Sequence, residues 1–212
     1  MNHYSLIAEL FRYPDAMLES TLKQIQSLLE EKYPDTIKEI IPFQEFIDSY
    51  NLPQQQEYYI KTFDVNALCY LDIGYILFGE DYKRGEFLVK LSQEHKKADN
   101  NCGSELADHL PNLLRLLDKS EDKEMVEELA YCLIIPALRA MLVSFKNESN
   151  AYRNVLQMVI AILEKDFQNS SLAQFHISTA GKDCFTGKAS IKNHACGMNQ
   201  RTHKGMVANP LQ

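Results

Sequence analysis

Asp108 and His109 stand side by side at the start of an apolar helical pattern, and their side chains are the pair in this chain best suited to recognition chemistry. A carboxylate accepts hydrogen bonds from cations or from the backbone N–H groups at a helix start, and an imidazole titrates near neutral pH. Apolar residues follow at helical spacing: Leu110, Leu113, Leu114 and Leu117. The pattern predicts a recognition surface at a helix entrance. A plain helix cap beside a partly exposed histidine stays open as the alternative.

The elements that must position this pair are predicted to be helices, because almost every apolar pattern in the chain has the helical period. Leu68 to Phe78 is apolar nearly all round and is predicted to be a central buried helix. No segment alternates in the manner of a strand. We therefore predict an all-α fold, a single helical bundle domain of about eight or nine helices over residues 1–168. Residues 169–212 lack amphipathic period and are predicted to form a flexible basic tail.

Capping residues and prolines set the expected helix limits. Asp81 is expected to cap the helix that runs from about Lys83 to Lys97, and Asp108 the helix through Leu117. Ser120 is expected to cap the long helix that follows. Pro136 predicts a bend in that helix, and Pro42 predicts a kink or break in an earlier one.

The charge is unevenly distributed, with a net charge of −7 for the 212 residues. Residues 181–212 hold five basic residues and one acidic residue, which leaves −11 on residues 1–180. An acidic body does not favour nucleic acid, whose phosphates need clustered Lys and Arg, and it favours a cationic partner. No apolar run approaches the ~18 residues of a membrane span, and the first residues lack the basic start of a signal peptide. We expect a cytoplasmic protein with reduced cysteines and no direct membrane insertion.

Other chemistry is weakly supported. The spacing of Cys184, His194, Cys196 and His203 fits no closed zinc motif, so no metal is expected. Cys102 lies near the Asp-His pair but has no evident third member of a catalytic set. A conventional phosphate-binding loop, GxxxxGK[ST], is absent from the sequence.

Four blocks of the sequence resemble the TorD/NarJ superfamily of redox-enzyme maturation proteins, and most closely its nitrate reductase assembly chaperones. These blocks are FRYPDAML, FDVNALCYLDIGYILFGEDYKRGEFLVKL, ELADHLPNLLRLL and AYRNVLQMVIAIL. Phe63-Asp64, Gly79-Glu80-Asp81 and Lys83-Arg84-Gly85 fill the places of the family's middle motif. Ala107 stands where the family usually has proline before Asp-His.

The resemblance implies a helical chaperone without turnover of its own and without a resident cofactor. Its partner would be the N-terminal peptide of a molybdopterin oxidoreductase catalytic subunit, held during cofactor insertion, before membrane targeting. The implied peptide-binding residues are Phe63, Asp64, Tyr70, Leu71, Tyr75, Arg84, Glu105, Asp108, His109, Leu110, Pro111 and Leu114. Two other functions stay open, a helical adaptor or small regulatory subunit retained in an oxidoreductase complex and an enzyme that uses the Asp-His pair. The protein is expected to be a monomer or a dimer.

Overall fold

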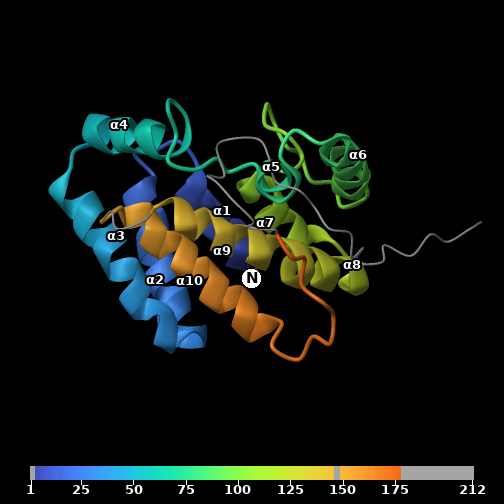
Figure 1. Cartoon of the computed structure of the whole chain (residues 1–212). Coiled ribbons are helices and arrows are strands. Elements are labelled where there is room, and N and C mark those ends of the chain that lie inside the picture. Colours follow the sequence, from blue (N-terminus) through green and yellow to red (C-terminus); the bar gives the residue numbers. More distant parts are fainter. Residues whose placement is uncertain (1–2, 146–148, 178–212) are drawn as a thin grey trace, which may run out of the picture.

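All named elements of the computed structural model, which describes residues 3–145 and 149–177, are helical (Figure 1). The α-helices are α1 (His3–Ala8), α2 (Leu18–Lys32), α3 (Ile37–Ser49), α4 (Leu52–Phe63), α5 (Ile73–Phe78), α6 (Tyr82–Lys97), α7 (Leu110–Lys119), α8 (Lys123–Glu127), α9 (Ile135–Ser144) and α10 (Ala151–Asp166). Three further helical stretches are η1 (Glu9–Phe11), η2 (Pro34–Thr36) and the π-helix η3 (Glu128–Ile134). The predicted all-α class is confirmed. Within the described residues, no helix has both the length and the apolar character needed to cross a membrane.

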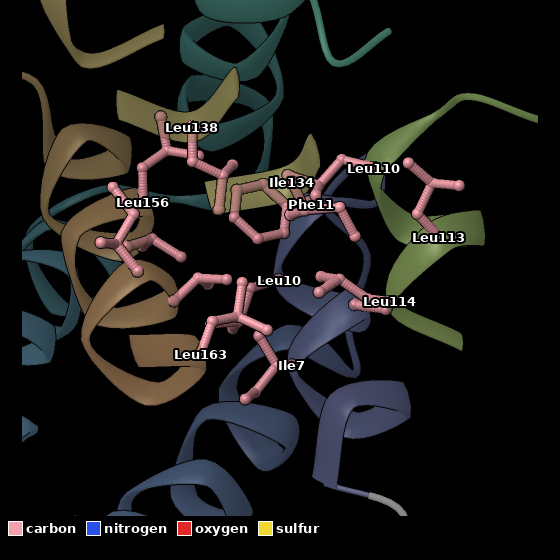
Figure 2. Packing of buried hydrophobic residues seen from close by; sticks show 14 of the residues in the cluster. Ile7, Leu10, Phe11, Leu110, Leu113, Leu114, Ile134, Leu138, Leu156 and Leu163 are labelled. Carbon is pink, nitrogen blue, oxygen red and sulfur yellow. The ribbon is translucent and has the colours of Figure 1, made fainter. Parts of the chain in front are cut away.

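One hydrophobic core joins the two ends of the sequence. Helix α1 packs against α7, and α10 packs against α3 and α9. Figure 2 shows Ile7 and Phe11 from the N-terminal segment meeting Leu110 and Leu114 of α7, with Leu163 of α10 close by. All five side chains have no exposed surface. Burying a leucine completely is worth about 1.5–3 kcal/mol, so the stripe on α7 is fully used in holding the bundle together.

The predicted central helix from Leu68 to Phe78 is wrong in its first half. Helix α4 ends at Phe63, Asn66 takes a left-handed conformation (φ 53°), and α5 begins only at Ile73. Between them the side chains alternate, with Ala67, Cys69 and Leu71 buried. This is the period of an extended chain, in which successive side chains point to opposite sides. Because every residue from 67 to 71 is apolar, the sequence alone does not show this alternation.

The helix limits predicted from capping residues are partly correct. The Asp81 carboxylate accepts a hydrogen bond from the Lys83 N–H and caps α6, as expected. The expected cap at Ser120 is wrong, because Asp122 caps α8 and the Ser120 hydroxyl accepts from the Asp122 N–H at 3.2 Å. Pro42 lies inside α3, which continues through it, so it is not a break.

At Pro136 the irregularity is a π-helix. The Ile135 N–H donates to the Ala130 carbonyl, five residues earlier, and α9 begins at once with Pro136 in its first turn. Proline cannot donate to the carbonyl four residues before it, so a local change of helix type is a common solution. The predicted bend corresponds to this change of helix type.

The packed chain extends beyond the predicted boundary at residue 168. Phe175 and Ile177 pack against the core, and the Phe175 N–H donates to the Cys132 carbonyl at 2.9 Å. The first residues of the predicted tail therefore belong to the helical body. The rest of that tail, residues 178–212, lies outside the described residues, and it includes all four Cys and His positions considered for zinc.

Candidate functional site

Two loops cross where the Asp-His pair lies. The Ile73 N–H donates to the Asp108 carbonyl and the Leu110 N–H donates to the Leu71 carbonyl, both at 2.9 Å. This places Asp72 opposite His109 in an isolated antiparallel bridge. The bridge brings the start of α5 to the start of α7, which are far apart in the sequence.

Arg84, from the first turns of α6, binds both loops. Its Nε donates to Asp108 Oδ2 at 3.0 Å, and its Nη2 donates to Asp72 Oδ2 at 3.3 Å. The guanidinium also lies over the Tyr75 ring, 5.5 Å from the centroid. Arg84 therefore forms ion pairs with Asp72 and Asp108, one carboxylate from each loop.

Asp108 is part of the interior and does not cap α7. The N-cap residue is His109, whose side chain makes no capping hydrogen bond, so the predicted cap is wrong. The Asp108 side chain has no exposed surface, and its Oδ1 has no hydrogen-bond partner among residues 3–145 and 149–177. Burial raises the pKa of this carboxyl despite the opposing effect of Arg84. A buried carboxylate of this kind depends on its cation, since an unpaired buried charge is costly.

Asp72 and His109 form the exposed side of the cluster. His109 Nδ1 lies 3.4 Å from Asp72 Oδ1 and 3.9 Å from Glu105 Oε2. The hydrogen bond with His109 and the charge of Arg84 lower the pKa of Asp72. Asp72 therefore stays ionised at neutral pH and can accept a hydrogen bond from an incoming cation.

Gly74 allows α5 to approach the cluster closely. A Cβ at position 74 would lie 2.6 Å from Asp108 Oδ2 and 3.0 Å from Phe87 Cδ1. No real Cβ tolerates the first of these distances, so only glycine fits between Asp108 and α6.

A buried polar network fixes the loop before Asp108. His95 Nε2 lies 2.9 Å from the Ala107 carbonyl, and Asn100 contacts both His95 Nδ1 and the Asn112 carbonyl. The Asn112 amide in turn donates to the Leu106 carbonyl at 2.9 Å. Burial lowers the pKa of His95, so it is held neutral. This network, with Asp72 and Gly74, was not predicted, because isolated polar residues in helical patterns resemble surface positions.

The predicted peptide-binding residues divide by burial. Most of the apolar ones are interior in this conformation, together with Asp108: Phe63, Leu71, Leu110, Pro111 and Leu114. The prediction that the leucine stripe of α7 forms an open surface is therefore wrong, because that stripe packs against α1. A cavity of about 380 Å³ exists elsewhere, between α2, α3 and α4, and none of its lining residues belongs to the predicted site.

The predicted residues that reach solvent are Asp64, Tyr70, Tyr75, Arg84, Glu105 and His109. Tyr70 and Tyr75 meet edge to face at 5.7 Å. Burial is the main cause of the raised pKa of Tyr59, and the charges of Glu105 and Asp64 add to it, so both carboxylates lie within electrostatic range of this ring. We call Asp64, Asp72 and Glu105 the acidic edge. Leu106, which is 49% exposed, is the apolar neighbour of Glu105 in the sequence.

The geometry gives little support to nucleophilic catalysis at this site. Burial raises the pKa of the Cys102 thiol, whose sulfur lies 3.9 Å from the Asn100 carbonyl. His109 is oriented by Asp72 and Glu105 instead of the thiol. Among residues 3–145 and 149–177, no group of three or more His, Cys, Asp and Glu side chains is arranged to hold a metal ion.

Comparison of the chain with protein-family models gave no match, and a search of curated proteins gave none either.

Proposed function

We propose that this protein is a chaperone that binds the N-terminal segment of a molybdoenzyme catalytic subunit, of nitrate reductase type, and assists cofactor insertion and assembly. The proposal combines the resemblance of four sequence blocks to assembly chaperones with an all-helical fold. The single observation that carries it is the acidic edge, three carboxylates beside exposed aromatic and aliphatic side chains. The protein would act in the cytoplasm, where the client acquires its cofactor, with no turnover of its own.

The chemistry of the acidic edge selects a particular class of peptide. Asp72 is ionised and hydrogen-bonded, while Asp64 and Glu105 are exposed and available to a Lys or Arg side chain. Tyr70 and Leu106 offer partly exposed apolar surface for a neighbouring hydrophobic residue of the peptide. A segment that alternates basic and apolar residues satisfies both parts of this surface.

The expected affinity is modest. Two or three partly exposed anchors contribute at most on the order of 3–9 kcal/mol, and ordering a disordered segment removes about 2–5 kcal/mol. Each exposed ion pair adds only about 0–1 kcal/mol. A dissociation constant of about 10 µM or weaker follows. The carboxylates then decide which peptide binds and in which direction, more than how tightly.

Calorimetric titration with the N-terminal peptide of a molybdopterin oxidoreductase catalytic subunit tests the proposal. Glu105→Lys and Asp64→Lys should each weaken binding severalfold, and added salt should reduce the difference from wild type. Glu31→Lys is the matched control, because Glu31 is also an exposed carboxylate and lies on α2, outside the acidic edge. The absence of heat up to millimolar peptide, or an equal loss in all three variants, would contradict the proposal.

A further inference from the structure

The chain returns to the bundle after α10 and lies on it as an extended strap. We use "strap" for residues 172–177, which follow the end of α10 at Asp166. Figure 1 shows this segment (orange) turning back after α10 and running beside the stretch from α8 to α9. Its residues form no helix, yet Phe175 and Ile177 pack against the core. Residues two apart in an extended chain lie on one side, so these two side chains face the bundle together.

The strap binds through a backbone acceptor that a proline makes available. In a regular α-helix the Cys132 carbonyl would accept from the N–H of residue 136, and Pro136 has none. The Phe175 N–H donates to that carbonyl at 2.9 Å. Beside it, the Arg139 side chain donates to Gln174 Oε1 at 2.7 Å and to Glu164 Oε1 at 2.6 Å. The π-helix thus presents a backbone acceptor to an added extended segment.

An aromatic surface receives the strap's main side chain. The Phe175 ring meets Phe78 edge to face at 5.5 Å, and Phe78 meets Phe87 in the same way at 5.4 Å. Edge-to-face pairs at these separations are favourable beyond the area that they bury. The receiving surface is therefore built from the end of α5, from α6 and from the π-helix, three elements remote from the strap in sequence.

The outer side of the strap is partly exposed. Gln174 is held by an exposed side chain, and Leu172 is 39% exposed. The Leu172 N–H donates to Ser170 Oγ, two residues earlier, and so does not tie the strap to the bundle. Release of the strap would expose the Phe78 ring and the Cys132 carbonyl that it covers.

We propose that the strap occupies a docking groove for an extended segment of a partner protein, in which an aromatic residue is followed by an aliphatic residue two positions later. The strap itself makes these contacts. The Phe175 ring packs on Phe78, and the Phe175 N–H donates to the Cys132 carbonyl. Two residues later, Ile177 supplies the aliphatic side chain. The inference rests on the proposed function in one respect, since it assigns the groove to the client's segment. The strap then acts as a competitor that keeps the apolar surface covered until a client arrives.

Phe87 links this groove to the acidic edge. Its ring contacts Phe78 on one side, and its Cδ1 lies where a Cβ on Gly74 would meet it. Arg84 lies one turn earlier on the same helix. A client segment in the groove therefore contacts α5 and α6, the helices that hold Asp72 and its partner Arg84.

The test uses the full chain and a fluorescent peptide with the sequence of residues 170–177. Fluorescence anisotropy should show that Phe175→Asp, which expels the strap, binds this peptide at least tenfold more tightly than wild type does. A peptide carrying alanine in place of Phe175 should lose the binding. Leu172→Asp is the matched control, because it adds the same charge to the strap at an exposed position and should behave as wild type.

Phe175→Ala provides a second, milder release of the strap if Phe175→Asp melts at a lower temperature than wild type. Equal binding of the peptide to wild type and to both Phe175 variants, or no binding to any of them at millimolar peptide, would overturn the inference. The client's N-terminal peptide, added as a competitor, should displace the labelled peptide. If the labelled peptide binds and the client peptide binds elsewhere without displacing it, the assignment of the groove to the client is overturned while the proposed function stands.

Discussion

Removing Arg84 should convert Asp108 from a paired carboxylate into an isolated buried acid. In Arg84→Ala the buried Asp108 carboxylate loses the guanidinium that pairs with it, and the charge of Asp72, which also acts on Asp108, has the same sign. Leaving one partner of a buried pair uncompensated costs about 3–5 kcal/mol. Protonating a carboxyl of ordinary pKa ~3.9 at pH 7 costs about 4 kcal/mol. Protonation of Asp108 therefore costs about as much free energy as leaving it charged and unpaired. The unfolding free energy at pH 7 should fall by about 3–5 kcal/mol.

The pH dependence gives this prediction its sign. A carboxyl whose pKa is raised in the folded state binds more protons when folded, so stability is lost as the pH rises from its unfolded pKa through its folded pKa. Arg84→Ala should therefore recover stability from pH 7 toward pH 5, by up to about 1.4 kcal/mol per pH unit while folded Asp108 is protonated and unfolded Asp108 is not. Urea unfolding at several pH values measures this.

The double variant Arg84→Ala/Asp108→Asn is the control, because it removes the charge and keeps the other losses of Arg84→Ala. It should regain most of the stability at pH 7 and lose the added pH dependence. A single variant within 1 kcal/mol of wild type at pH 7, or a double variant with the same pH profile as the single one, would refute the reasoning.

Three further predictions concern packing and the hydrogen bonds that Asp166, at the end of α10, accepts from His3, Tyr4 and Tyr33. Gly74→Ala should destabilise by about 1–3 kcal/mol because its Cβ meets Asp108, whereas Gly85→Ala, in open space within α6, should stabilise by about 0.5–1 kcal/mol; thermal unfolding of both decides. Tyr152→Phe should be neutral or stabilising by up to about 1–2 kcal/mol, because the buried hydroxyl has no hydrogen-bond partner within the described part of the chain; urea unfolding would show a clear loss if this is wrong. Burial opposes ionisation of Asp166, but hydrogen bonds from one histidine and two tyrosines outweigh it and lower the pKa of this carboxyl. Stability should therefore fall as the pH drops through that lowered pKa. In an acid-unfolding series, Asp166→Asn should remove this part of the acid sensitivity.

The fold was predictable because helical patterns are dense and long. The helix now seen at Ala151–Asp166 has apolar side chains at every third or fourth position, and its core face follows directly. Local capping chemistry was equally visible at Asp81. The extended stretch around Cys69 was not, because every residue there is apolar and the period that distinguishes strand from helix is lost.

The site was only partly predictable, because burial depends on which helix covers which. The α7 stripe is compatible with a partner's groove or with the chain's own N-terminal helix, and only the fold selects α1. Asp108 illustrates the same limit, since its pairing with Arg84 spans 24 residues of sequence. The role of Pro136 was predictable as an irregularity, but the segment that uses the resulting acceptor arrives about 40 residues later, at Phe175.

The central claim is that the acidic edge receives the client's N-terminal segment. Amide hydrogen exchange of the full chain, with and without that peptide at saturating concentration, tests the claim most directly. The account predicts slower exchange in residues 64–72 and 103–109 on binding, with little change in the loop between α2 and α3. Bound peptide with unchanged exchange in both segments of the acidic edge would contradict it.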